Sequence, residues 1–187
     1  MAETCHYKYL VIDNQDLLEI NNLQRKVNPA EKHPEPVLTM DAPWDRDDEV
    51  LSYANVLYDR QENIFKMWYF VWRAASQEAG VIVDGGNKLA YATSTDGIHW
   101  ERPELGIVEI DGSSKNNYVI PEMSMYGGTL IDDPSDIAAR RYKMIMGTAR
   151  RKTAFAVSAD GIHWSNPKLN NQITLAGDTR NNMFWDS

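Results

Sequence analysis

One internal repeat constrains the fold of this chain more than any other feature. Residues Tyr91–Leu105 recur as Phe155–Leu169, and nine of the fifteen positions are identical. The period, from Asp96 to Asp160, is longer than the repeat of a solenoid protein. The sequence therefore predicts at least two copies of one structural unit, arranged one after the other.

Each copy predicts a hairpin. A short strand, 88–94 or 152–158, is followed by Asp-Gly and then by a second short strand that begins with Ile-His-Trp. Asp-Gly between apolar strands favours a tight turn, because glycine accepts positive φ and aspartate bonds its own backbone. Trp100 and Trp164 follow the turn at the same offset. We expect both to pack one unit on the next rather than to contact a sugar.

Two further strands precede each hairpin. They are predicted at 51–58 and 64–72 in the first unit and at 126–132 and 141–148 in the second. With the hairpin strands, each unit becomes a four-stranded antiparallel meander, which is the blade of a β-propeller. The aromatic run Met67–Trp72 fits a strand packed between sheets. The predicted fold is all-β and of the propeller type, with about two and a half blades in this chain.

The same pattern divides the chain into four parts. A lead-in covers 1–43, the first blade 44–106 and the second blade 107–170, and 171–187 starts a third blade. Two and a half blades cannot close a ring, and an open last sheet would expose an apolar face. We therefore expect the natural protein to continue beyond this chain.

The composition narrows the classes of partner and cofactor that this chain is expected to bind. The net charge is -8 without a long basic run, which argues against nucleic acid. Cys5 is the only cysteine, and no segment has the apolar length of a signal peptide or a membrane span, so we expect no membrane contact and a cytoplasmic location. The four histidines are scattered and the Gly-Gly pairs lack a phosphate-binding context, so no cofactor is predicted. The oligomeric state stays open.

The order of these elements resembles the five-bladed propellers of invertases, levansucrases and arabinanases, and more closely a bacterial branch related to glycoside hydrolase family 32. The motifs that carry the resemblance lie between 34 and 187, and they include Val56–Asp59, Phe65–Tyr69, Tyr91–Trp100, Lys115–Val119, Gly127–Pro134, Arg141–Met144 and Asp178–Asp186. The resemblance implies a glycosidase with three carboxyl groups at the mouth of a central channel, because an oxocarbenium-like transition state needs a carboxylate and a proton donor. It also implies an axial Ca²⁺ in some relatives, whose ligands the sequence does not identify.

Carried onto this chain, the resemblance gives candidate residues. The segment that corresponds to the invertase motif before the first strand is Trp44–Val50, which lacks the Pro-Asn-Gly portion of that motif. Asp47 or Asp48 is the candidate catalytic carboxylate that this resemblance implies; the alternative is a solvated acidic loop. At the third blade, Arg180 stands where the family has an aspartate, and Asp178 is a further candidate. Asn181 and Asn182 are expected to bind sugar hydroxyls together with Arg180. The general-acid glutamate is expected after Ser187.

Three functions fit these observations. The first is hydrolysis of glycosidic bonds in an oligosaccharide or polysaccharide. The second is carbohydrate binding without catalysis, with contacts from Trp44, Tyr53, Tyr126 and Asn182. The third rests on a resemblance of the Asp-Gly hairpins to the Asp-boxes of sialidases, which are structural and distant from the sialidase site; it ranks below the other two.

Overall fold

The strands form two four-stranded antiparallel sheets in the computed structural model, which describes residues 19, 21–22, 24, 26–73, 76–78, 81–83, 86–123, 125–148, 152–170 and 181–184. The chain divides into two units, 1–34 and 35–187. All strands belong to the second unit, and the described residues contain no α-helix.

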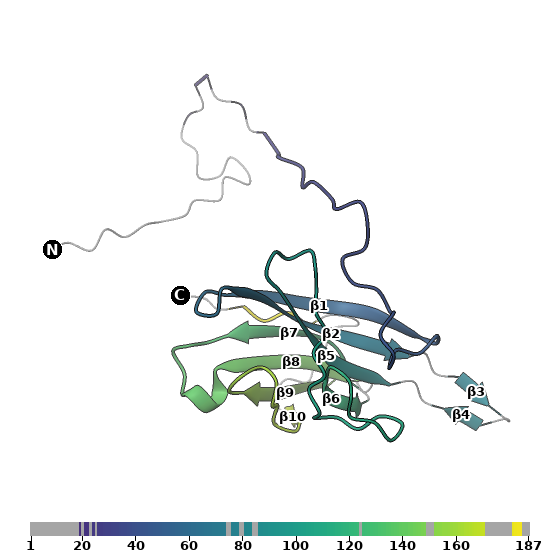
Figure 1. Ribbon diagram of the computed structural model, residues 1–187. Coiled ribbons are helices and arrows are strands. Elements are labelled where there is room, and N and C mark those ends of the chain that lie inside the picture. Colours follow the sequence, from purple (N-terminus) through teal and green to yellow (C-terminus); the bar gives the residue numbers. More distant parts are fainter. Residues whose placement is uncertain are drawn as a thin grey trace. The chain divides into compact units, whose positions relative to one another are not determined.

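Each sheet is a meander of consecutive strands (Figure 1). The first sheet contains β1 (Glu49–Asp59), β2 (Ile64–Arg73), β5 (Asn87–Ser94) and β6 (Tyr118–Met123). The second contains β7 (Met125–Asp132), β8 (Tyr142–Thr148), β9 (Thr153–Ser158) and β10 (Lys168–Asn170). A small hairpin of β3 (Ser76–Glu78) and β4 (Val81–Val83) separates β2 from β5, and a 3-10 turn, η1 (Ala138–Arg140), separates β7 from β8.

The all-β prediction and the first three strands of each predicted unit are confirmed, to within two residues at each end. The fourth strand is different. The predicted strand after each Asp-Gly turn is wrong, because pairing there is limited to the single bridges Thr93–Glu101 and Ser158–Trp164. β6 and β10, further along the chain, take the fourth place. The propeller type, and with it the number of blades in the whole protein, stays a prediction.

Side-chain hydrogen bonds explain why the Asp-Gly segments do not continue as strands. The Asp96 carboxylate accepts from the backbone N–H groups of Ile98 and His99, both at 2.8 Å, and Asp160 does the same for Ile162 and His163. These N–H groups are therefore not available to a neighbouring strand. The contact with the His99 ring, together with these backbone hydrogen bonds, lowers the pKa of Asp96 below its ordinary value.

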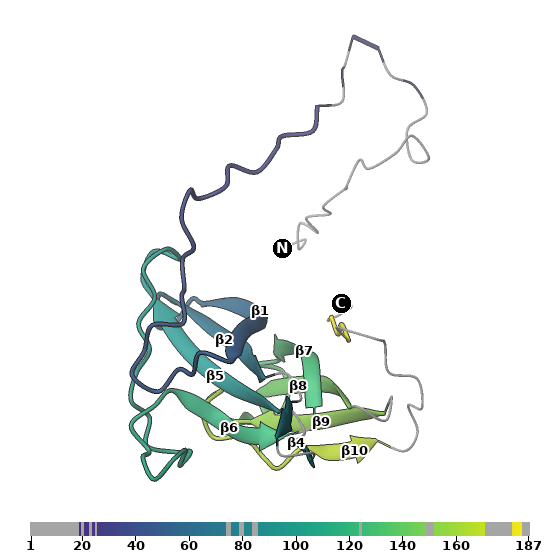
Figure 2. The same cartoon turned by 90° about the vertical axis from the view of Figure 1, so that its right-hand side faces the viewer.

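The two sheets pack face to face, and Figure 2 shows them from the side. The strands alternate, so that Trp68 and Phe70 of β2 face the second sheet, where they meet Tyr142, Met144 and Met146 of β8. Trp164 packs against this cluster, as predicted, whereas Trp100, for which the same packing between units is predicted, lies on the opposite face of the first sheet. Met67, Tyr69 and Val71 point to the opposite face, where Trp44, Trp100, Val108 and Ile110 cover them.

A side-chain hydrogen bond joins β1, the first strand of one sheet, to β7, the first strand of the other, and a similar contact recurs later in the chain. Asn55 of β1 donates to the Gly128 carbonyl at 2.9 Å and accepts from Leu130 N–H, so its amide completes the edge of β7. The Thr129 hydroxyl oxygen, at the equivalent position in β7, lies 2.8 Å from the Asn181 carbonyl oxygen and 2.9 Å from Asn182 Oδ1. The segment 181–184 therefore contacts β7 in the way that β7 contacts β1.

A buried carboxylate at the end of β1 gives a prediction about acid stability. Hydrogen bonding by Lys66, at 2.9 Å, lowers the pKa of Asp59 from 3.8 to about 2 against the opposing effect of burial. Its stabilisation is complete above the unfolded-state pKa and is lost as the pH falls through about 2. We expect Asp59→Asn to reduce the free energy of unfolding by about 2 kcal/mol at pH 7. Urea unfolding between pH 2 and 7 measures this; a cost that does not shrink in acid would contradict it.

Candidate functional site

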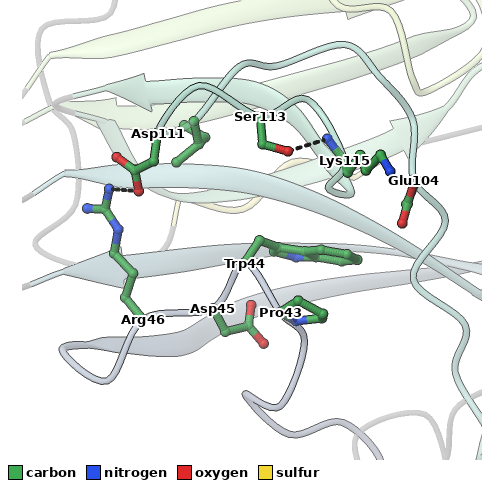
Figure 3. A pocket seen from close by; sticks show the side chains of 9 residues that line it. Pro43, Trp44, Asp45, Arg46, Glu104, Asp111, Ser113 and Lys115 are labelled. Atoms are coloured by element: carbon green, nitrogen blue, oxygen red, sulfur yellow. Dashed lines mark hydrogen bonds and ion pairs between the residues drawn. The ribbon is translucent and has the colours of Figure 1, made fainter.

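A cavity of about 370 Å³ lies over the face of the first sheet that points away from the second sheet. Two segments line it, the approach to β1 and the loop between β5 and β6. The lining residues are Pro43, Trp44, Asp45, Arg46, Glu104, Ile110, Asp111, Ser113 and Lys115. In Figure 3 the Trp44 ring lies between the Arg46–Asp111 pair and the side chains of Glu104 and Lys115.

A tight turn at residues 110–113 forms one wall of this cavity. Asp111 and Gly112 both have positive φ, 52° and 76°, and Ile110 and Ser113 exchange two backbone hydrogen bonds around them. This is the pattern of a two-residue hairpin, for which Asp-Gly is a preferred sequence. Asn116 fixes the turn to the loop, since its side chain donates to the Val108 carbonyl at 2.8 Å.

The Trp44 indole is held by a buried polar chain. Its Nε1–H donates to Asn117 Oδ1 at 3.0 Å, and Asn117 Nδ2 lies 2.7 Å from both the Tyr69 hydroxyl and the Tyr91 carbonyl. Asn117 is fully buried, and burial raises the pKa of Tyr69. The ring is therefore fixed through its polar edge while it lines the cavity, which suits an aromatic surface for an uncharged ligand.

The carboxylates on the Arg46 side of the cavity are paired with arginines. Asp45 accepts from Arg102 at 2.7 Å and from Ala42 N–H at 2.9 Å, and its side chain is only 6% exposed. Arg46 donates to Asp111 at 2.5 Å, which raises the pKa of Arg46 and lowers that of Asp111. Both ion pairs join residues far apart in the sequence, so they hold the loop onto the approach to β1.

Asp47 and Asp48, the predicted catalytic carboxylates, lie in the turn that leads into β1. Both are exposed, and neither lines the cavity, although the turn directly follows the lining residue Arg46. A backbone hydrogen bond from Glu49 N–H to the Arg46 carbonyl closes this turn. Of the predicted residues that the structure describes, Trp44 alone lines the cavity.

Tyr53 lies at a bulge in β1 and has a φ of 46°. Gly127, at the equivalent bulge of β7, has a φ of 47°. Positive φ is ordinary for glycine and strained for a tyrosine, and such strain often marks a functional position. Tyr53 borders a second, mainly apolar cavity of about 300 Å³ between β1, β2 and 37–38. Tyr126 belongs to β7, and its side chain lies outside the described residues.

The predicted residues near the end of the chain are only partly described. Asp178 and Arg180 lie outside the described residues. Asn181 N–H donates to the Gly127 carbonyl at 3.2 Å, and Asn182 is exposed beside Thr129. The structure therefore places Asn181 and Asn182 along β7 and not in the cavity that Trp44 lines.

The described residues contain no group of three or more histidine, cysteine, aspartate or glutamate side chains that could hold a metal ion. Within the same part of the chain, no helix has the length and apolar character needed to cross a membrane.

Sequence reasoning missed most of the cavity. The residues that it did not identify are Pro43, Asp45, Arg46, Glu104, Ile110, Asp111, Ser113 and Lys115. The Asp111-Gly112 pair was the available signal, because it predicts a tight turn in the long segment before β6. No local pattern announces that this turn reaches Arg46.

Comparisons with known proteins give distant similarities. No family model matches the chain. It is 27% identical over 161 residues to the uncharacterised protein Rv1502 of Mycobacterium tuberculosis, an alignment that covers 81% of this chain and 43% of that protein. The crystal structure of an N-acetylgalactosamine deacetylase from F. plautii, in complex with blood group B trisaccharide, aligns with a TM-score of 0.45 and 15% identity over 67% of this chain and 37% of that one. The chain thus spans less than half the length of each.

Proposed function

We propose that this chain forms the sugar-holding part of a glycoside hydrolase that acts on an oligosaccharide or polysaccharide. The observation that carries the proposal is the cavity over Trp44, where an indole held through Asn117 is surrounded by charged hydrogen-bonding groups. Sugar sites combine an aromatic surface for the ring with a few polar groups for the hydroxyls. The exposed carboxylates of Asp47 and Asp48 directly follow this wall and are the candidates for the chemistry.

The chemistry would use a carboxylate of this turn on one side of the glycosidic bond and a proton donor on the other. Because Asp45 and Asp111 are already bound by Arg102 and Arg46, they are better suited to fixing the loop than to attacking a substrate. That leaves Asp47 and Asp48 as the carboxylates of the turn without an ion pair among the described residues.

A second candidate function is carbohydrate binding without hydrolysis. It is favoured because Asp45 and Asp111, two carboxylates that line the cavity, are already paired with arginines. The two functions share the Trp44 cavity and differ in whether Asp47 or Asp48 takes part in a reaction. Calorimetry with a panel of glycans, followed by analysis of the same mixtures for released sugars, separates them. Tight binding without product would support the binding protein and contradict the hydrolase.

Replacing Trp44 tests both candidates. We expect Trp44→Ala to weaken glycan binding by at least about tenfold, as loss of a central aromatic contact does. Trp44→Phe keeps a ring, loses only the bond to Asn117, and should retain most of the affinity. The matched control is Trp72→Ala, which removes a tryptophan that is 43% exposed and outside the cavity. Unchanged binding by Trp44→Ala would contradict the site.

Replacing the two aspartates tests catalysis. In the hydrolase, either Asp47→Asn or Asp48→Asn is expected to remove most of the turnover while glycan binding and the unfolding temperature stay unchanged, because both residues are exposed in a turn. Initial rates of sugar release with each variant measure this. Full turnover in both variants would show that the catalytic assignment is wrong.

A further inference from the structure

The bulge in β1 breaks the alternation of that strand. Leu51 packs on the face of the first sheet that points away from the second sheet. Regular alternation would place Tyr53 on the same face, because residues two apart in a strand share a face. Tyr53 instead packs against the hydrophobic cluster between the sheets, and its backbone has a positive φ of 46°. The bulge therefore turns the tyrosine ring from one face to the other, as bulges beside functional sites do.

The second cavity, of about 300 Å³, lies on the face from which the Tyr53 ring is turned away. Its walls include Leu38, Leu51, Met67 and Tyr69, and all four belong to the cluster on that face. Tyr69 is the residue of β2 opposite the bulge, since Ser52 pairs with Phe70 and Asn55 with Trp68. The cavity thus lies where a regular strand would place the ring of residue 53.

The equivalent bulge in β7 is packed closely. Gly127 and Gly128 stand in place of Tyr53 and Ala54, and a Cβ on Gly128 would collide with the Ile145 carbonyl oxygen. Ala54, in contrast, is exposed and lines the cavity. A tyrosine at positive φ is strained, whereas a glycine is not. The first repeat therefore keeps a cavity where the second has close-packed backbone, and it does so with a strained residue, which is common at ligand sites.

The lining of this cavity determines which chemistry it can hold. None of the residues that line it carries a charge at neutral pH. Two of its polar groups are used within the protein: the Tyr69 hydroxyl accepts from Asn117 Nδ2 at 2.7 Å, and Ser52 Oγ donates to the Phe70 carbonyl at 3.4 Å. A ligand would therefore be held by apolar side chains and the Tyr69 ring, and a charged group would lose its hydration without gaining a partner.

We propose that the second cavity binds an uncharged aromatic ring of about the size of phenol, in the space that regular alternation would give to the side chain of Tyr53. The size and shape follow from the tyrosine ring that is turned away, and the lack of charge follows from the lining. Met67 adds a thioether, which packs favourably on aromatic rings. The two cavities share no lining residue, so the inference does not depend on the proposed function.

The test is a titration of the purified protein with phenol, cyclohexanol and benzoate. The readout is the ¹H–¹³C NMR signal of the Met67 methyl group, assigned by its absence in Met67→Leu. We expect phenol to shift this signal and to saturate it at millimolar concentration, as small ligands of apolar cavities do. Cyclohexanol should bind several-fold more weakly, because it cannot stack on the Tyr69 ring. Benzoate should bind at least about tenfold more weakly than phenol, because its charge has no partner there.

Two variants fill the cavity from different sides. Ala54→Phe adds a ring from β1, and Val37→Trp adds one from the segment before β1, so the second tests the site if the first does not fold. Each is expected to weaken phenol binding by at least about tenfold, because its ring takes the place of the ligand. Val50→Phe is the matched control, since Val50 is exposed on the same strand and does not line the cavity. It should bind phenol like the unmodified protein.

The inference is overturned if phenol does not bind, or if cyclohexanol or benzoate binds as tightly as phenol. It is also overturned if Ala54→Phe and Val37→Trp, both folded, bind phenol like the unmodified protein. These outcomes leave the proposed function as it is, because glycan binding at Trp44 is measured in a separate titration.

Discussion

Replacing Gly161 by alanine is expected to destabilise the protein by about 3 kcal/mol, whereas the same substitution at Gly97 should cost about 1 kcal/mol. The two glycines occupy equivalent turns of the repeat and have nearly the same φ, 79° and 77°. A Cβ at Gly161 would lie 2.5 Å from the Trp68 ring, whereas a Cβ at Gly97 would meet Phe65 at an ordinary 3.7 Å. Both variants bear the free-energy cost of placing alanine at positive φ. Only Gly161→Ala also brings the added Cβ into collision with Trp68.

The difference between the two variants therefore measures how firmly the second repeat packs on the first sheet. Trp68 is fully buried, and its Nε1–H donates to the Gly161 carbonyl at 2.6 Å, so the ring has no room to move aside. Urea unfolding of both variants gives the two free energies. If both variants lost the same free energy of unfolding, this would contradict the close packing of the second repeat on the first sheet.

Replacing Lys88 by methionine is expected to reduce the free energy of unfolding by about 3 to 5 kcal/mol. Lys88 forms an ion pair with Glu49, and the two side chains are only 3% and 1% exposed. The Lys88 ammonium also lies 4.8 Å from the centre of the buried Tyr118 ring. Without the lysine, the Glu49 carboxylate would remain buried without a compensating charge.

The double variant Glu49→Gln with Lys88→Met is the control for this prediction. The double variant removes the unpaired buried charge of Glu49, so it should recover most of the stability that Lys88→Met loses. Thermal and urea unfolding of the single and double variants complete the cycle. A double variant that is less stable than Lys88→Met would show that the buried charge is not the cause.

The repeat allowed most of the strand positions to be predicted. Hairpin chemistry and alternating apolar residues are local signals, so β1, β2, β5 and β7 to β9 were visible in the sequence. The fourth strands were not, because Asp96 and Asp160 bind the backbone N–H groups after the turn with their own side chains. The chain then needs a long loop before β6. The sequence indicates that this loop exists but does not show which part of the fold it packs against.

The candidate site was predicted less completely than the strands. Trp44 was found because its motif resembles a family motif, whereas five of the residues that line the cavity with it come from the loop between β5 and β6. The contacts Arg46–Asp111 and Asp45–Arg102 depend on how that loop folds back, which no spacing reveals. Tyr53 was proposed as an aromatic sugar contact, and only the structure shows that it shares its positive φ with Gly127.

The most direct test of this account is a titration that follows the indole N–H signals of the protein in ¹H–¹⁵N NMR spectra while a neutral oligosaccharide is added. The Trp44 signal, assigned by its absence in Trp44→Phe, is predicted to shift and saturate, because this indole lines the cavity and donates to Asn117. The signal of the buried Trp68 should stay in place. A glycan that binds while the Trp44 signal remains unchanged would contradict the account.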